Sequence, residues 1–319
     1  MPAAPVFRGN GRTLGTYSEP TCNSRRITVG PPGMSRTIEQ RTNLDGFPKA
    51  SELIEMSGLE DLEASQRAIS NLLYQHAHES GRIADPTAVF EIPMATLRTA
   101  LSKHESGDRL RASLTTLMRV VVRVAYVDGT SEQRVMISGL FRFLDISRKD
   151  LATRATLRYG ISHELQTILE RSQRWGRIKA EVFCAMKSKY AMALYEMLEL
   201  RRNLDRCIET FTVERFRELM SVKPEAYQIG FDLQRSVVEP AMLEVNGLSD
   251  MGVKIDLQRK HSRAPFQAVT IAWWRKSPGE LAEVIRERNR SKVGRTARLK
   301  GAVEAATPRV ALSLPGLPE

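Results

Sequence analysis

The stretch that decides the fold lies between Phe183 and Arg275. It reads FCAMKSKYAMALYEMLELRR (183–202), then FTVERFRELM (211–220) and YQIGFDLQRSVVEPAMLEVNGLSD (227–250), and finally VKIDLQRK (253–260) and FQAVTIAWWR (266–275). The first three segments repeat apolar residues at helical spacing, and the last two alternate as strands do. Helix, helix, helix, strand, strand is the order of a winged helix, a small domain that presents one helix to a DNA groove.

Residues that start or stop helices support this order. Thr212 is the expected N-cap of the second helix, with Glu214 in its first turn. The third helix begins near Ile229 and contains Pro240, which lacks a backbone N–H. We therefore expect a kink or break there, with Glu239 as the boundary.

The first half of the chain carries a looser version of the same order. A β-branched run followed by Asp128-Gly129 predicts a hairpin, and Gly107-Asp108 predicts a turn before the third helix. We expect a helix ending near His78, a helix entered at Pro93, a helix over 110–121, strands over 120–127, 134–144 and 151–159, and a helix near 162–172.

These patterns predict an α+β protein, mainly helical, with two tandem winged-helix domains and short antiparallel hairpins. Order is expected to begin near Ser51. The expected divisions are a disordered basic arm over 1–50, an N-terminal winged-helix domain over 51–172, a C-terminal winged-helix domain over 173–276 and a charged C-terminal extension over 277–319. The arm and the extension either follow DNA phosphates or are solvated chain ends.

Composition favours a polyanionic partner. The 319 residues include 48 Lys+Arg against 37 Asp+Glu, which gives a formal net charge of +11 and a pI near 9.8. Nucleic acid is the leading candidate for the partner of such a positive field, and an anionic membrane surface is the second.

No apolar run approaches the ~20 residues of a membrane span, and the N-terminus lacks a signal-peptide core. Three widely spaced cysteines indicate neither disulfides nor zinc, so we expect a cytoplasmic protein.

The polar face of the third helix in the second half is the expected reading face, because that helix enters the major groove. Arg can read guanine and Gln can read adenine through two hydrogen bonds. The candidates there are Gln228, Gln234, Arg235 and Ser236, with Arg215, Arg217 and Lys223 for phosphate and Arg259, Lys260 and Arg263 at the wing tip. In the first half, Arg109 and Arg111 are the candidate phosphate contacts.

The loop after the first predicted hairpin strand has the opposite character. Asp128–Gln133 contains Asp128 and Glu132 and no basic residue. Interpreted as the tip of the first wing, this loop is not expected to lie on DNA, because carboxylates repel phosphate.

Signatures of enzymes are scarce. The chain lacks GxxxxGK[ST], which disfavours an ATP-driven initiator or helicase. His76-Ala77-His78, with Tyr190 and Tyr195 downstream, has the residue types of a rolling-circle nickase. On a helix, however, positions i and i+2 diverge, so we expect no metal site. We therefore predict no catalytic residues, no metal and no cofactor.

Several segments together resemble replication initiator proteins from iteron-containing plasmids, the Rep family of paired winged-helix proteins. SKYAMALYE at Ser188–Glu196 resembles a signature of that family, over a likeness that covers roughly 60–275. This chain has Gln234-Arg235 where the family usually has a basic pair. The same pattern is matched by Trp175–Ile178, Phe231–Ala241, Glu244-Val245-Asn246 and Ser249-Asp250.

The resemblance implies a function. Such proteins bind iterons, which are repeated double-stranded DNA sites at a plasmid origin, as monomers. They help to open an adjacent AT-rich region and recruit the host initiator and helicase. As dimers in equilibrium with the monomer, they often repress their own gene. The second winged helix usually dominates iteron reading, and the first contributes DNA contacts or the dimer interface.

Two other readings remain open at this stage. A winged-helix transcriptional repressor without initiation activity uses the same scaffold, and the sequence does not separate it from an initiator. A nicking replicase is the third hypothesis, and it requires a Tyr190 nucleophile and a divalent metal.

Overall fold

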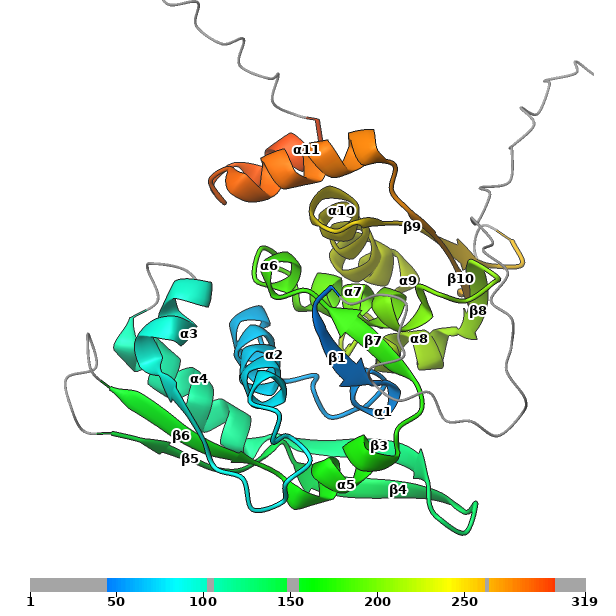
Figure 1. The fold of residues 1–319 in the computed structure, drawn as a ribbon. Coiled ribbons are helices and arrows are strands. Elements are labelled where there is room, and N and C mark those ends of the chain that lie inside the picture. The colour runs from blue at the N-terminus through cyan, green and yellow to red at the C-terminus, as the bar shows by residue number, and fades with distance from the viewer. Residues whose placement is uncertain (1–44, 102–105, 148–154, 262–263, 302–319) are drawn as a thin grey trace, which may run out of the picture.

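The structure is a computed structural model that describes residues 45–101, 106–147, 155–261 and 264–301. Its elements form two winged helices that pack against each other (Figure 1). The helix-rich α+β architecture expected from the sequence is confirmed. Within the described part of the chain, no helix is long and apolar enough to cross a membrane.

The first winged helix places three helices on a three-stranded antiparallel sheet. The helices are α2 (Ala64–Glu79), α3 (Met94–Leu101) and α4 (Gly107–Arg119). The sheet has the order β2 (Phe90–Pro93), β6 (Thr156–Ile161), β5 (Phe141–Ile146). The predicted turn at Gly107-Asp108 is wrong, because Ser106 caps α4 by accepting a hydrogen bond from the Arg109 N–H at 3.2 Å.

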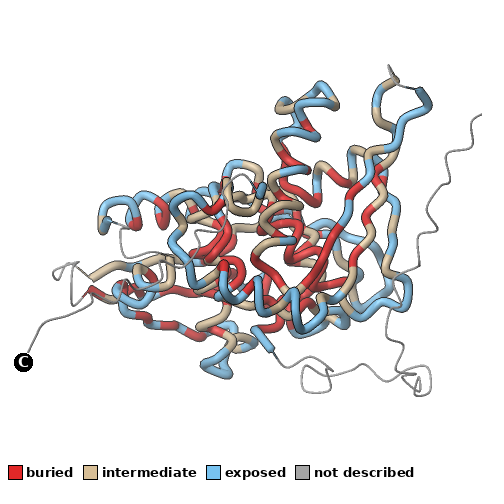
Figure 2. The backbone as a smooth tube through the Cα atoms, turned by 90° about the horizontal axis from the view of Figure 1, so that it is seen from above, coloured by how far each residue is buried: buried red, intermediate tan, exposed pale blue. Residues whose placement is uncertain are grey.

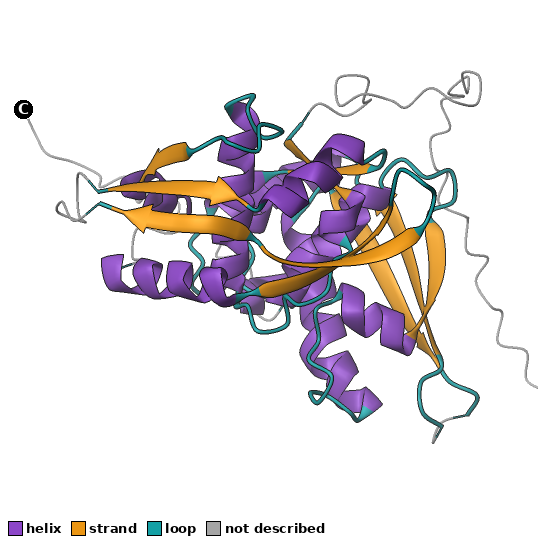
Figure 3. Ribbon diagram, turned by 90° about the horizontal axis from the view of Figure 1, so that it is seen from below, coloured by secondary structure: helices purple, strands orange, loops and turns teal. Residues whose placement is uncertain are grey.

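A separate two-stranded ribbon stands beside that sheet. It consists of β3 (Val121–Val127) and β4 (Gln133–Gly139), which pair only with each other among the named strands. The single strand predicted over 134–144 is therefore wrong, since β4 and β5 lie in different sheets with Leu140 between them. The ribbon is an insertion between the third helix and the rest of the sheet (Figure 3).

The second winged helix repeats the same plan without an insertion. Its first helices are α7 (Lys189–Arg201) and α8 (Val213–Leu219), and Thr212 caps α8 as predicted. Its third helix runs through α9 (Gly230–Leu233), the π-helical turn η2 (Gln234–Val238) and α10 (Glu239–Leu248). The sheet has the order β8 (Ile208–Thr212), β10 (Ala268–Arg275), β9 (Met251–Gln258).

Three differences from the expected elements concern this half. The helix expected from Phe183 begins at Lys189, because Ser188 caps it and the short α6 (Ala180–Phe183) precedes it. The strand β8 was not predicted. Beside Pro240 the helix widens without ending: the Glu239 N–H donates to the Gln234 carbonyl, five residues back, and the predicted boundary at Glu239 is where η2 is followed by α10.

Short elements join the two winged helices. The strand β1 (Phe47–Ala50) pairs antiparallel with β7 (Trp175–Ile178), and α1 (Ser51–Ile54) and α5 (His163–Arg171) flank them. All four residues of β1 are buried, so order begins before Ser51, contrary to the expected boundary of the arm. The rest of the arm, residues 1–44, lies outside the described residues.

The charged segment after the last strand is packed against the second winged helix. It forms α11 (Pro278–Asn289) and α12 (Arg295–Leu299), and both contact α10. Arg295 and Glu287 are buried, and the Arg295 Nη1 donates to the Ala185 carbonyl at 2.8 Å. The reading of this segment as a solvated chain end is therefore wrong for the residues that the structure covers.

The core is continuous between the two halves, and α7 is its centre. Every residue from Ala191 to Arg201 is buried, as the unbroken red segment of the tube shows (Figure 2). Glu196 on this helix accepts from Arg67 of α2 at 2.9 Å and from Lys49 of β1 at 3.2 Å. Burial raises the pKa of Glu196, but the two cations more than offset that and hold it at about 2. This buried ion cluster joins the first helices of the two winged helices.

Candidate nucleic-acid interface

The third helix of the second winged helix has one buried face and one polar face. Leu233, Val237 and Val245 are buried against the domain. Gln234 and Arg235 are exposed and Ser236 is half-buried, so the predicted reading residues come together on the outer side of α9 and η2. Within the described ranges, no side chain forms an ion pair with Arg235. Its five donors therefore remain available for a groove or a phosphate.

Arg217 has a different position from the one expected. Its guanidinium donates to the carbonyls of the loop between α8 and α9: Tyr227 at 3.0 Å, Lys223 at 3.0 Å, Pro224 at 3.3 Å and Ala226 at 2.5 Å. In the free protein these bonds occupy the guanidinium that was predicted to contact phosphate. Arg217 holds the turn of the helix-turn-helix, whose residue Tyr227 has a left-handed φ of 51°.

The other two predicted phosphate contacts form exposed ion pairs. Lys223 lies 2.7 Å from Asp61, and Arg215 lies 3.2 Å from both Glu55 and Glu218. The hydrogen bond from Lys223 lowers the pKa of Asp61. Exposed pairs contribute only about 0–1 kcal/mol, so a phosphate can replace any of these three carboxylates.

The two glutamines each form one local hydrogen bond. The Gln228 amide donates to the Pro224 carbonyl, and the Gln234 amide donates to Glu239 at 3.1 Å. Each side chain keeps its carbonyl oxygen and a second N–H donor, so neither bond prevents a base contact.

The wing lies against the start of the reading helix. A Cβ on Gly230 would come within 2.4 Å of the Phe266 ring, so this glycine lets the end of the wing approach α9 closely. Arg259 lies over the same ring at 5.4 Å from its centroid, and Lys260 is exposed beside it. Arg263 lies outside the described residues. Arg259 therefore lies near the start of the helix that carries Arg235.

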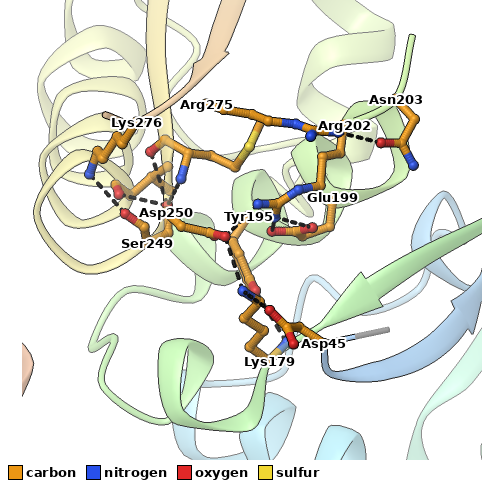
Figure 4. A network of polar contacts seen from close by, with 12 residues as sticks. Asp45, Lys179, Tyr195, Glu199, Arg202, Asn203, Ser249, Asp250, Arg275 and Lys276 are labelled. Atoms are coloured by element: carbon orange, nitrogen blue, oxygen red, sulfur yellow. Dashed lines mark hydrogen bonds and ion pairs between the residues drawn. The ribbon is translucent and has the colours of Figure 1, made fainter. Parts of the chain in front are cut away.

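The far end of the reading helix is anchored by a charged network (Figure 4). Asp250, which follows α10, forms ion pairs with Lys179 at 3.0 Å and with Arg202 at the end of α7. Burial raises the pKa of Asp250, but Arg202 and Lys179 more than offset that and hold it at about 2. Lys276 donates to the Ser249 carbonyl at 2.8 Å, and burial lowers its pKa to about 8. The helix is therefore held at both ends.

In the first winged helix, α4 occupies the place of the reading helix. Arg109 and Arg111 are exposed on it, and no acidic side chain in the described part of the chain pairs with either. Arg119 and Arg123 are exposed farther along the same region. These cations are positioned for a DNA backbone, but α4 (Gly107–Arg119) contains no Asn or Gln side chain that could read a base as Gln234 can.

The first wing is not where the sequence suggested. In the three-stranded sheet β5 pairs with β6, and the residues between these two strands, 148–154, lie outside the described residues. The acidic loop 128–133 instead closes the inserted β3–β4 ribbon. Thr130, Glu132 and Arg134 all donate to Asp128, and these hydrogen bonds hold the pKa of Asp128 well below its usual range. The interpretation of this loop as an acidic wing tip is wrong.

The residues considered for nicking have packing roles. His76 Nδ1 lies 2.9 Å from the Tyr159 hydroxyl, and Tyr195 is buried with its hydroxyl accepting from the Lys179 N–H. Tyr190 packs edge-on against Tyr227, with ring centroids 6.3 Å apart. Over the ranges the structure describes, no group of three or more His, Cys, Asp or Glu side chains has the arrangement of a metal site.

Sequence reasoning did not find two participants in this interface: the Phe266–Gly230 contact and the exposed pair Ile229 and Phe231. An isolated Gly at a helix start signals a close approach. The sequence alone does not say what approaches.

Two helix-turn-helix units with exposed cations on their third helices define a tandem winged-helix DNA-binding protein. Comparison with known proteins identifies the family to which it belongs. The family of the initiator replication protein, WH1, matches residues 48–199, and the initiator Rep protein, WH2, matches residues 212–273. The chain belongs to this family of replication initiators, as its resemblance predicted.

A solved structure has the same fold. The Pi initiator protein, crystallised in complex with iteron DNA, matches with a TM-score of 0.53 at 12% identity, over 72% of this chain and 97% of that one. Domains 2 and 3 of RctB match with a TM-score of 0.40 at 8% identity, over 71% of this chain and 85% of that one. No curated protein matches the chain.

Proposed function

We propose that this protein initiates plasmid replication by binding repeated origin sites through both winged helices. The observation that carries the proposal is the exposed Arg235 on the third helix of the second winged helix, with the wing residue Phe266 packed against the start of that helix, in a chain of the initiator family. The solved relative named for its complex with iteron DNA supports the choice of iterons as the site.

The two winged helices are proposed to make different contacts with DNA. The second, over 173–276, reads bases through Gln228, Gln234, Arg235 and Ser236, while Arg215 and Lys223 contact phosphate. The first, over 51–172, contacts the backbone through Arg109 and Arg111. Arg217 supports this surface by holding the loop before α9 and does not touch DNA.

Initiation itself needs partners. Bound monomers are proposed to promote opening of an adjacent AT-rich region and to recruit the host replication initiator and helicase in the cytoplasm. These steps need no nucleotide, metal or catalytic residue of this chain, because binding energy at several repeats is sufficient to distort DNA. The charged network around Asp250 fixes the reading helix so that bound copies have one orientation on the repeats.

We propose that a second copy of the chain binds to the β3–β4 ribbon. Val121 and Val127 of β3, with Val135 and Ile137 of β4, lie on one face of the ribbon and are each more than half exposed. No named strand pairs with the outer edge of β4. Such a face and edge favour pairing with an identical ribbon about a two-fold axis. This dimer is proposed to repress the gene and to exchange with the origin-binding monomer.

The dimer proposal has its own test. Ile137→Lys puts a charge in the ribbon face and should shift the full-length protein to a monomer in sedimentation at micromolar concentration. Ile285→Lys, on the exposed side of α11, is the matched control and should leave the oligomeric state unchanged. Equal dimer populations in the wild type and the Ile137 variant would place the interface elsewhere.

A transcriptional repressor without initiation activity is the alternative function. The experiment that separates the two supplies the protein in trans to a plasmid whose only origin is the DNA flanking the gene. An initiator establishes that plasmid, and Arg235→Ala abolishes establishment. A repressor silences a reporter behind the same DNA but never establishes the plasmid, and this outcome would overturn the proposed function.

A further inference from the structure

Two large apolar side chains are exposed at the start of the reading helix. Ile229 is 67% exposed and Phe231 is 65% exposed. A single exposed apolar residue is ordinary on a protein surface. Two within three residues, on the one surface that the domain presents to DNA, form a patch that favours a ligand contact.

Their place in the helix is the place that reads bases. Ile229 is the N-cap of α9, and its carbonyl accepts from the Asp232 and Leu233 N–H groups. In helix-turn-helix proteins, the N-terminal residues of the second helix contact base edges. Phe231 and Arg235 are four residues apart, so their side chains lie on the same side of the helix.

The surroundings fit a nucleic acid better than a protein. The Phe266–Gly230 contact brings Arg259 close to this end of the helix, and Lys260 follows in the wing. Cations near the apolar pair can contact the phosphates that border a groove while the helix faces the bases. Asp232 is also exposed on this turn, and a carboxylate there can accept from the amino group of cytosine.

We propose that Ile229 and Phe231 contact the C5-methyl groups of thymines in the major groove, beside the base that Arg235 reads. The thymine methyl is the apolar group that base pairs present in that groove, and Phe is one of the side chains that contacts it. The inference rests on the proposed function, because it assigns bases to the same surface. It adds specificity for thymine to a face that otherwise offers hydrogen bonds.

The test is uracil interference on the DNA flanking the gene, with the full-length protein. Random replacement of thymine by uracil removes single methyl groups and leaves every hydrogen bond of the base pair in place. Wild-type binding should weaken roughly fourfold at one or two thymines per protected repeat, the effect of one buried methyl. Phe231→Ala and Ile229→Ala should each bind more weakly and should lose that interference.

Controls make the outcomes distinct. Ile285→Ala changes an exposed isoleucine of α11 and should keep the wild-type interference pattern. Arg235→Ala should weaken binding but keep the thymine interference. Wild-type binding with no interference at any thymine, or the same pattern in the Phe231 and Ile229 variants, overturns the inference while the proposed function stands. If the wild type protects no repeated site, the proposed function has failed.

Discussion

The two winged helices share one topology, and they differ because only the first contains an inserted ribbon. Both sheets place the third strand between the first and the second, in the orders β2-β6-β5 and β8-β10-β9. In the second, α10 ends at Leu248 and the wing strand β9 begins at Met251. In the first, the whole β3–β4 ribbon intervenes between α4 and β5. The second is thus a compact reading unit, whereas the first carries an additional surface.

The reading helices also differ in how they are held. The helix of the second domain is fixed at its start by Phe266 on Gly230 and at its end by the ion pairs of Asp250. The start of α4 is held by the Ser106 cap. A helix held at both ends keeps its side chains in register with bases, while a helix that contacts phosphates needs less exact placement. This contrast predicts which substitutions alter specificity and which alter affinity alone.

The largest expected effect breaks the link between the two domains. Glu196→Gln leaves the buried Arg67 and Lys49 without their carboxylate, and we expect a loss of about 3–5 kcal/mol in the free energy of unfolding. Urea denaturation of the full chain at neutral pH measures it. Glu283→Gln, an exposed glutamate of α11, is the control and should change stability little.

The same residue gives a pH dependence with a definite sign. The pKa of Glu196 is about 2 in the folded protein against an ordinary 4.5, so its stabilisation is present above pH 4.5 and is lost as the pH falls toward 2. The unfolding free energy of the wild type should fall over that window more steeply than that of Glu196→Gln. Parallel pH profiles would contradict the assigned role.

The next effect concerns the loop before the reading helix. Arg217→Ala removes hydrogen bonds to the carbonyls of Lys223, Ala226 and Tyr227, and Arg217→Lys cannot replace a planar guanidinium. We expect each variant to lose about 1–3 kcal/mol of stability. Hydrogen exchange should rise at residues 223–229 and stay unchanged in α4. If affinity for DNA falls while this exchange is unchanged, Arg217 contacts DNA directly.

A comparable effect on binding is expected for the base reader. Arg235→Ala should cost about 1–3 kcal/mol on the preferred site and much less on unrelated DNA, so that specificity relaxes. Competition binding at one fixed salt concentration measures the ratio. Equal losses on specific and unrelated DNA would reassign Arg235 to the backbone.

The smallest expected effect concerns the phosphate contacts of α4 in the first winged helix. Arg109→Ala and Arg111→Ala should each weaken binding to all sequences alike and lower the slope of log affinity against log salt by about 1. Titrations at several salt concentrations measure this slope. A change of sequence preference in either variant would show that α4 reads bases as well.

Much of the fold could be predicted from the spacing of apolar residues and from residues that start or stop helices and strands. The stripes of α2 and α8, the Thr212 cap and the alternation of β9 and β10 are local patterns. The strands β1, β7 and β8 were missed because each is short and forms only by pairing with a strand that is distant in sequence. The ribbon was mistaken for a wing because Val120–Val127 and Asp128-Gly129 specify a hairpin but not the sheet to which it belongs.

The candidate site was predictable in composition and less so in geometry. Arg215, Lys223 and Arg235 are exposed where a basic face was expected, because charge placement along a helix follows its period. The role of Arg217 depends on where the carbonyls of a loop turn, and Tyr227 at φ 51° is not visible in a pattern. The link between Phe266 and Gly230 joins residues far apart in sequence and needs the folded chain.

The most direct test of the account is a footprint of the full-length protein on the DNA that flanks its gene, at fixed salt. The account predicts protection of tandem repeats beside an AT-rich stretch. At the protein concentration that saturates the wild-type footprint, Arg235→Ala should lose this protection, and at higher concentration it should protect the repeats with less preference over neighbouring DNA, whereas Arg109→Ala should regain the wild-type pattern at higher concentration. Protection of no repeated element, or an unchanged footprint with Arg235→Ala, would contradict the claim that the second winged helix reads origin repeats.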